Sequence, residues 1–378
     1  MSERNIKNSQ EHVVVCVDGP DADNQAAAWG AANAFNSKEI NLAAVIVSGT
    51  AVNNEPNAAL GSRDDQLSKR VQEMHTARMA GLFKRAGSKV PVFIGQSVDR
   101  TDITTPIPHS AHVSHDDYDI FGDNTGAGRK AIAGNFAHAL SLMRSLEGKV
   151  HLVCGGPFTE IPFFMEDERI ASKLGNLAVQ AGVELSERAI YSKIAFNHEV
   201  DERASLDTFL HYPGDMFYVP SDITRAPAAT FKGAEELIRG GVHSEIGEIF
   251  VRHRARAEER HKEEQIRRER EGKPFRPYPA LSIHDLQAVM ALQQSLGREK
   301  DIFTFEPIDA ARAITNVMRA SKLHEANGQR AVITPRLVKT MGYIGANQTA
   351  SGPIPPRYVV ASQNTQLYKR KALQLLRR

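Results

Sequence analysis

Three carboxylates and an amide follow an apolar run near the beginning of the sequence. The segment VVVCVDGPDADNQAAAW, residues 13–29, places Asp18, Asp21 and Asp23 within six positions, and Asn24 comes next. Carboxylates held this close repel one another unless a cation, a sugar hydroxyl or a shared proton lies between them. The same residues also fit a solvated turn in which Asp23 caps the following helix. The pattern therefore predicts an oxygen-lined ligand site or a helix cap.

The elements that must position these residues alternate along the chain. Continuous apolar runs typical of strands buried on both faces occur at residues 12–17, 42–47, 90–94, 150–154 and 216–219. Segments with helical spacing lie between or after them, at residues 24–36, 66–86, 129–146, 168–181 and 201–211. The alternation predicts an α/β fold with a mostly parallel open sheet flanked by helices, in a single domain. Ligand sites in such sheets gather at the carboxyl ends of strands, where Asp18, Thr50 and Gly155 are expected.

The domain is expected to span residues 12–350, after a polar tail at 1–11. Residues 252–276 carry charges of both signs and predict a solvated helix with i,i+4 ion pairs, a subunit arm or a lid. Residues 351–378 are expected to form a C-terminal extension ending in a basic amphipathic helix. These segments supply the surface for assembly.

Composition narrows the class of protein. The chain has 378 residues, of which 41% are hydrophobic and 24% charged, as in ordinary globular proteins. A net charge of +2 gives no electrostatic basis for nucleic-acid binding, and no apolar run is long enough for a membrane helix. The polar beginning carries no apolar signal core, and Cys16 and Cys154 both lie in strand-like runs. We therefore expect a cytoplasmic protein without a disulfide framework.

Several short motifs occur in a fixed order along residues 12–300. The sequence reads DGPDADN, then KVPVFIG, CGGPFTE, AFNHEVDERAS, VPSDIT and IHDLQAV. This series resembles the motifs DxDPGxDD, PVxxG, TGPLTN, EFNxxxDPEAA, PLDVT and HDPLAV of the inosine-uridine preferring nucleoside hydrolase family. The resemblance implies a nucleoside hydrolase-like fold. It also implies an enzyme that cleaves the N-glycosidic bond of a ribonucleoside or related ribosyl compound.

The resemblance also implies a calcium ion that binds ribose hydroxyls and an attacking water. Calcium suits such a site because it accepts six to eight oxygen ligands in flexible geometry. The matching positions assign residues to the metal, to the substrate and to catalysis. The metal ligands are Asp23, Asn24, a main-chain carbonyl at Gly155 or Cys154, and Asp285. Asn197 matches a substrate contact and His284 a catalytic residue. Thr50 stands where the family has an asparagine and is expected to contact the substrate. Asp18 and Asp21 are out of phase with the motif, and we expect Asp18 to be catalytic and Asp21 to contact the substrate.

The chain departs from the family at several of these positions. Gly19 stands where the family has its water-activating aspartate, and Ala195 stands where it has a glutamate. If hydrolysis occurs, we expect Asp18 to replace the missing base, with Asp21 as the second choice. Two functions follow: an N-ribosyl hydrolase, or a catalytically impaired relative that binds a ribosyl ligand or serves in assembly. Family members usually form dimers or tetramers, so a homo-oligomer is expected.

Overall fold

A computed structural model describes most of the chain. It covers residues 10–18, 22–49, 65–97, 125–180, 197, 201–224, 226, 228–272, 274, 281–307 and 355–377. Of the predicted site residues, Asp21 and Thr50 lie outside this part of the chain. Within it, no helix is both long enough and apolar enough to cross a membrane.

One sheet organises the described residues. Its strands follow the order β4-β3-β2-β1-β5-β6-β7-β9-β8. Every neighbouring pair is parallel except β8 with β9. The strands are β1 (Glu11–Val17), β2 (Ile40–Gly49), β3 (Val92–Ser97), β4 (Ile132–Gly134), β5 (Val150–Cys154), β6 (Leu174–Val179), β7 (Met216–Tyr218), β8 (Phe303–Pro307) and β9 (Arg357–Gln363). The predicted mostly parallel open sheet is confirmed.

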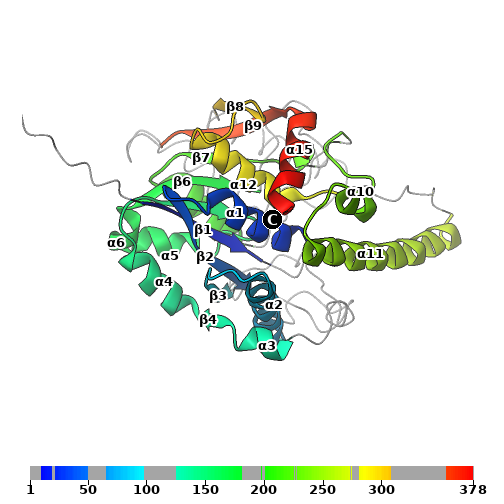
Figure 1. Cartoon of the computed structure of the whole chain (residues 1–378), viewed down its shortest axis with the longest axis horizontal. Helices are drawn as coiled ribbons and strands as arrows, with labels where there is room; N and C mark the ends of the chain where they lie inside the picture. The colour runs from blue at the N-terminus through cyan, green and yellow to red at the C-terminus, as the bar shows by residue number, and fades with distance from the viewer. Residues whose placement is uncertain are drawn as a thin grey trace, which may run out of the picture.

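Helices cover both faces of this sheet (Figure 1). Alternate residues of β1 belong to two separate cores: Val13 and Val15 face one, and Val14 and Cys16 face the other. The first core takes residues from α1 (Ala22–Phe35), α2 (Asp65–Arg85), α10 (Ala234–Arg239), α11 (Ser244–Arg270), α12 (His284–Ser295) and α15 (Thr365–Leu376). The second core takes residues from α4 (Phe136–Ser145), α5 (Ile161–Glu166), α6 (Glu168–Ala171) and α8 (Glu202–His211). Two further short helices are α3 (Thr125–Arg129) and α9 (Ser221–Thr224).

Two predicted helices are wrong in part. The helix expected at 129–146 is interrupted by β4, because Gly134 has a φ of 151° and Asn135 caps the new helix α4. The helix expected at 168–181 ends at Ala171 and is followed by β6. Parallel pairing of β6 with β5 and β7 outweighs the helical spacing of its apolar residues.

The last elements of the chain join the same architecture. β9, within the expected extension 351–378, lies between β7 and β8 in the sheet. The predicted basic helix is α15, whose Tyr368, Ala372 and Leu376 belong to the first core. The predicted charged helix is α11, which begins earlier than expected and extends away from the rest of the molecule (Figure 1). Cys16 and Cys154 are register partners on β1 and β5, and both are free thiols.

Candidate functional site

The first acid of the opening segment lies at the carboxyl edge of the sheet. Asp18 directly follows β1, which is flanked by β2 and β5, and its exposed fraction is 9%. Its Oδ1 accepts a hydrogen bond of 3.0 Å from Asn24 Nδ2 in the first turn of α1. The strand end and the helix beginning are thereby joined through two of the predicted site residues.

The side-chain amide oxygen of Asn24, Oδ1, has no hydrogen-bond donor among the described residues. This side chain is buried, and its Oδ1 accepts no hydrogen bond, although its Nδ2 is bonded to Asp18. Asp23 lies inside the first turn of α1, so it is not the residue that precedes the helix as a cap. Its Oδ1 instead accepts a bond of 3.1 Å from the backbone N–H of Asn24.

The turn after β5 touches the acids of two other elements. A Cβ atom at Gly155 would lie 2.8 Å from Cγ of Asp285, and one at Gly156 would lie 2.8 Å from Cβ of Asp18. Both distances are too short for a side chain, so only glycine permits this approach. Asp18 and Asp285 therefore flank one turn, and both raise the pKa of the nearby Cys154 thiol in addition to the larger effects of burial and Glu160.

The predicted pair His284 and Asp285 begins α12. Asp285 is buried in the first turn of this helix, where the helix dipole stabilises a negative charge. The cap residue is Ile283, which makes no side-chain cap bond, and Asp285 lies inside the helix rather than capping it. His284 Nδ1 shares a hydrogen bond with Thr224 Oγ1 of α9.

The predicted substrate residue Asn197 is also at this edge. Its Nδ2 donates to the carbonyl oxygen of Gly155 at 2.9 Å and to the carbonyl oxygen of Gln180 at 2.9 Å. The same nitrogen lies 3.2 Å from Gln180 Oε1. The predicted metal-ligand carbonyl of Gly155 is thus held by the predicted substrate residue.

The structure brings together Asp18, Asn24, Gly155, Asn197 and Asp285 at the carboxyl edge of the sheet. In the described part of the chain, no group of three or more His, Cys, Asp or Glu side chains is arranged to hold a metal ion. A cation here would depend on amide and main-chain oxygens as well as carboxylates.

Glu160 is a buried acid that the sequence analysis did not select. It ends the segment CGGPFTE, where the family motif TGPLTN ends in Asn, and it is fully buried. Its Oε2 accepts from Ser48 Oγ at 2.7 Å and its Oε1 from the backbone N–H of Gln96 at 2.9 Å. Burial is the main cause that raises the pKa of Glu160 to about 7. The sequence signal that could have identified Glu160 is a glutamate at the position where the family motif has asparagine.

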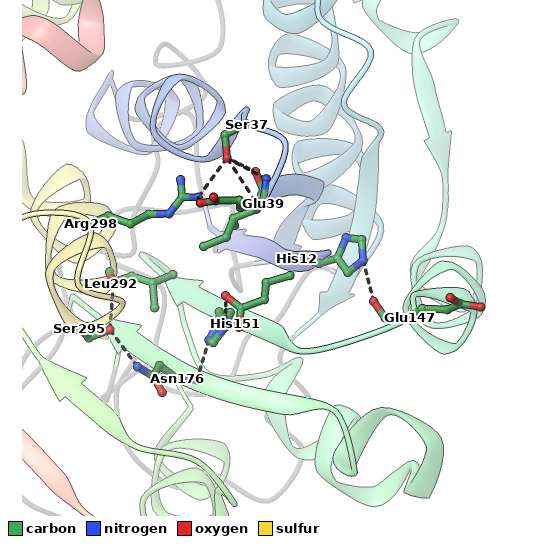
Figure 2. Close-up of polar contacts among 11 residues, drawn as sticks. His12, Ser37, Glu39, Glu147, His151, Asn176, Leu292, Ser295 and Arg298 are labelled. Atoms are coloured by element: carbon green, nitrogen blue, oxygen red, sulfur yellow. Dashed lines mark hydrogen bonds and ion pairs between the residues drawn. The ribbon is translucent and has the colours of Figure 1, made fainter. Parts of the chain in front are cut away.

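A polar network at the opposite, amino edge holds the far end of α12 (Figure 2). Asn176 of β6 donates its side-chain N–H to Ser295 Oγ at 3.0 Å, and its backbone N–H to His151 Nδ1 at 2.9 Å. Arg298, beyond α12, donates to Ser37 Oγ at 3.0 Å and lies 3.6 Å from Glu39. These contacts fix the axis of α12 and so the position of Asp285 at its other end.

Cavities of about 540 and 680 Å³ also lie toward the amino edge. The larger is lined by Trp29, Asn41, Val90 and His243 among others, and the smaller by Arg298 and Lys371 among others. None of the predicted site residues lines either cavity. These cavities are therefore distinct from the candidate site.

This mostly parallel sheet with its covering helices matches solved structures that have the nucleoside hydrolase-like fold. No family model and no curated protein matches the sequence. Among solved structures, the type III effector XopQ complexed with adenosine diphosphate ribose matches with a TM-score of 0.60 and 12% identity, covering 97% of this chain and 93% of that one. The plant nucleoside hydrolase PpNRh1 matches with a TM-score of 0.53 and 16% identity, over 96% and 98% of the two chains. An inosine-guanosine nucleoside hydrolase matches with a TM-score of 0.53 and 12% identity, over 97% and 98%. The predicted fold is confirmed, whereas membership of the inosine-uridine preferring family stays a prediction.

Proposed function

We propose that this chain is an N-ribosyl hydrolase that binds a ribonucleoside or related ribosyl compound at the carboxyl edge of its sheet. The observation that carries the proposal is the convergence of Asp18, Asn24, Gly155, Asn197 and Asp285, which come from five separate segments. Buried carboxylates at this place would stabilise the positive charge that develops on the ribose ring during cleavage of an N-glycosidic bond. The nucleoside hydrolases among the structural neighbours support the same reaction class.

The oxygen atoms at this edge fit a calcium ion. Asn24 Oδ1 is a buried acceptor without a donor, and the carboxylates of Asp18 and Asp285 flank the same glycine turn. Asp23, Asn24, Asp285 and the Gly155 carbonyl are the residues that would hold the ion. When bound, calcium would supply an oxygen-ligand centre for ribose hydroxyls and for a more acidic water.

Asp18 is the proposed general base. Gly19 leaves the family position of the base without a carboxylate, and Asp18 is the adjacent acid, held by Asn24 at 3.0 Å. Asn197, Asp21 and Thr50 would contact the substrate, and His284 would assist on the side of the leaving group. Asn197 would need only to exchange one of its three acceptors for a ribose hydroxyl.

A second candidate is a protein that binds a ribosyl ligand without cleaving it. Two observations favour it: Gly19 replaces the usual base, and Asn197 is already engaged with Gly155 and Gln180. The structure of XopQ with adenosine diphosphate ribose gives a neighbour in which a ribosyl compound is bound. The same site in this chain would then bind such a compound for recognition or assembly.

The two candidates are separated by assaying base release and binding in parallel. Purified protein with calcium is incubated with a panel of ribonucleosides, and free base is followed chromatographically. The hydrolase proposal expects release that Asp18→Asn lowers by about 10² to 10⁴, the contribution of a general base. Binding of ADP-ribose and inosine by the same variant should stay within about three-fold of wild type, because the side-chain shape is kept.

Asp301→Asn is the matched control, because Asp301 is exposed and its φ of 61° is well tolerated by asparagine. Equal release by wild type and Asp18→Asn would show that Asp18 is not the base. Binding without release from any ribonucleoside would establish the second candidate. The absence of both binding and base release would overturn both candidate functions.

A further inference from the structure

Glu160 accepts hydrogen bonds at the carboxyl ends of two strands, β2 and β3, that are separate from the strand it follows. Its two carboxylate oxygens accept from Ser48 on β2 and from Gln96 on β3, at 2.7 and 2.9 Å. Glu160 follows β5, which lies on the far side of β1 from β2 and β3. The side chain therefore links the β2–β3 edge to the glycine turn that carries Gly155.

These bonds occur where the ladder between β2 and β3 is irregular. The register pairs Val47 with Ile94 and then Gly49 with Ser97, so three steps on β3 oppose two on β2. An extra residue of this kind leaves backbone groups without ladder partners. The N–H of Gln96 is such a group, and Glu160 accepts its hydrogen bond in place of a strand.

Two further residues fit this irregularity. A Cβ atom at Gly95 would lie 2.3 Å from Glu160 Oε1, so the space that a side chain would fill at this position holds the carboxylate. Gln72 of α2 donates from Nε2 to the carbonyl oxygens of Val47 and Gly95, each at 3.0 Å. The carboxylate and the amide together satisfy groups of both strands at the bulge.

Among the described residues, Asp201, Cys16 and Cys154 are the titratable groups whose charges interact with Glu160. Its own pKa is raised by burial first, lowered by its bonds with Ser48 and Gln96, and raised slightly by Asp201, which precedes α8. Cys16 on β1 and Cys154 on β5 face it, and burial and Glu160 raise the pKa of both thiols. Of Glu160, Cys16 and Cys154, Glu160 alone has a pKa near neutral pH.

We propose that Glu160 is a positioning residue, whose carboxylate replaces missing ladder contacts and fixes where β2 and β3 end beside the candidate ribosyl site. Thr50, a predicted substrate contact, directly follows the end of β2 in the sequence. The effect on ligand binding rests on the proposed function, whereas the effect on the strand ends does not. Ionised Glu160 holds the Gln96 N–H more strongly than the neutral acid does, because charge-assisted hydrogen bonds are stronger.

The test is hydrogen exchange of the β2 and β3 ends in the full chain, measured by mass spectrometry and corrected for intrinsic exchange rates. Glu160→Ala should accelerate exchange of the peptide that contains Gln96 by about ten-fold, the effect of losing a hydrogen bond to a charged group. Glu160→Gln keeps the shape and one acceptor, so it should retain protection.

Glu166→Gln makes the same chemical change at an exposed position of α5 and should exchange like wild type. A peptide from β5 serves as an internal reference for global unfolding. ADP-ribose titrations of the same proteins should show about ten-fold weaker binding for Glu160→Ala, as expected for a displaced contact residue. Exchange of the Gln96 peptide at wild-type rate in Glu160→Ala would overturn the proposal. Accelerated exchange in that variant, with no ADP-ribose binding by wild type, would overturn the proposed function and leave the role of Glu160 standing.

Discussion

Asn24 presents the clearest unmet hydrogen-bonding need at the candidate site. A buried carbonyl oxygen without a donor costs about 1–3 kcal/mol, and Asn24 Oδ1 is in this state beside Asp18. A positive ion next to this oxygen and the two flanking carboxylates would recover that cost. The unsatisfied oxygen of Asn24 is therefore a physical reason to expect cation binding, independent of the family resemblance.

Chelator-stripped protein should bind one calcium ion, and Asp285→Ala should abolish this binding. Asp285 touches the Gly155 turn and lies in the first turn of α12, so its removal takes away a carboxylate ligand of the proposed site. Isothermal titration with calcium measures the affinity directly. Asp285→Asn, which keeps the volume of the side chain, should weaken binding by at least about ten-fold, as expected for loss of one charged ligand.

Asp207→Asn, a change in α8, is the control for general loss of acidic charge. Absence of saturable binding to wild type at millimolar calcium would contradict the metal assignment. It would also favour the non-catalytic candidate function. Unchanged binding by Asp285→Ala would instead show that the ion lies elsewhere.

Glu160→Gln should gain stability relative to wild type as the pH rises from 5 to 8. The folded pKa of Glu160 is raised from 4.5 to about 7, so between these values the unfolded chain has released a proton that the folded chain keeps. Wild-type stability contributed by this group therefore falls as pH rises through that window. The difference should approach about 3 kcal/mol at pH 8, since one pKa unit corresponds to 1.36 kcal/mol.

His75 makes the free energy of unfolding rise with pH, opposite to the effect of Glu160. The variant and wild type must therefore be compared at each pH. Burial and Arg78 lower the pKa of His75 from 6.5 to about 3, and the stability this histidine contributes is lost as pH falls below 6.5. The two slopes oppose each other in wild type but not in the difference. Urea unfolding at pH 5, 6, 7 and 8 measures this difference, and a constant value would contradict the raised pKa of Glu160.

The site residues that the sequence predicted lie at the ends of regular elements, whereas those it missed depend on contacts between elements. Asp18, Gly155 and Asp285 follow or begin regular elements, and parallel strands bring such positions to one edge. Glu160 was missed because its role depends on a bulge between β2 and β3, and no local pattern reports a register shift. The acceptors of the Asn197 side chain could not be predicted either, because Gly155 and Gln180 follow different strands, β5 and β6.

At the scale of elements, the candidate site depends on how closely α1 and α12 pack. α1 has an alanine-rich buried surface that includes Ala26, Ala27 and Gly30. A Cβ atom at Gly30 would lie 2.3 Å from Cδ1 of Leu286, which is fully buried two residues after His284. The absence of a side chain at Gly30 thus sets the distance between the helices that carry Asn24 and Asp285.

Gly30→Val should lower the free energy of unfolding by about 1–3 kcal/mol, the usual cost of overpacking a buried contact. The reason is that the added side chain would meet Cδ1 of Leu286, which is fully buried and must shift within a packed core. Gly126→Val is the matched control, because nothing lies within 4 Å of a Cβ at that position of α3. Thermal and urea unfolding measure both. Equal stability of the two variants would show that the α1–α12 contact adapts freely.

The sequence predicted β1, β2, β3, β5 and β7 from their apolar runs and missed β4, β6, β8 and β9. Continuous apolar runs such as residues 150–154 are typical of a strand buried on both faces, and β5 has these bounds. The segment 168–181 was read as helical from its apolar spacing, yet most of it pairs as β6. Short apolar segments fit both the helical and the strand period. Pairing with strands that are distant in the sequence decides between them.

At the scale of the whole molecule, one helix departs from the compact arrangement of sheet and covering helices. α11 is anchored by its first turns, where Ile246, Ile249 and Phe250 belong to the first core. Beyond them the helix extends outward (Figure 1) and carries exposed Val251 and Ile266. Ion pairs such as Arg254 with Glu258, at 3.0 Å, support the helix in solvent without anchoring it to the body.

We expect this surface to take part in a homo-oligomer. A projecting helix of 27 residues offers area toward the roughly 1,200–2,000 Å² that stable interfaces bury. Light scattering at micromolar protein should therefore give a mass at least twice the 41.6 kDa of one chain. Ile266→Lys should lower that mass, because a charge replaces an exposed apolar side chain that would be buried between subunits. Ile238→Lys alters an equally exposed isoleucine on α10 and should leave the mass unchanged. A wild-type mass near one chain would contradict the oligomer, and an unchanged mass for Ile266→Lys would place its interface away from α11.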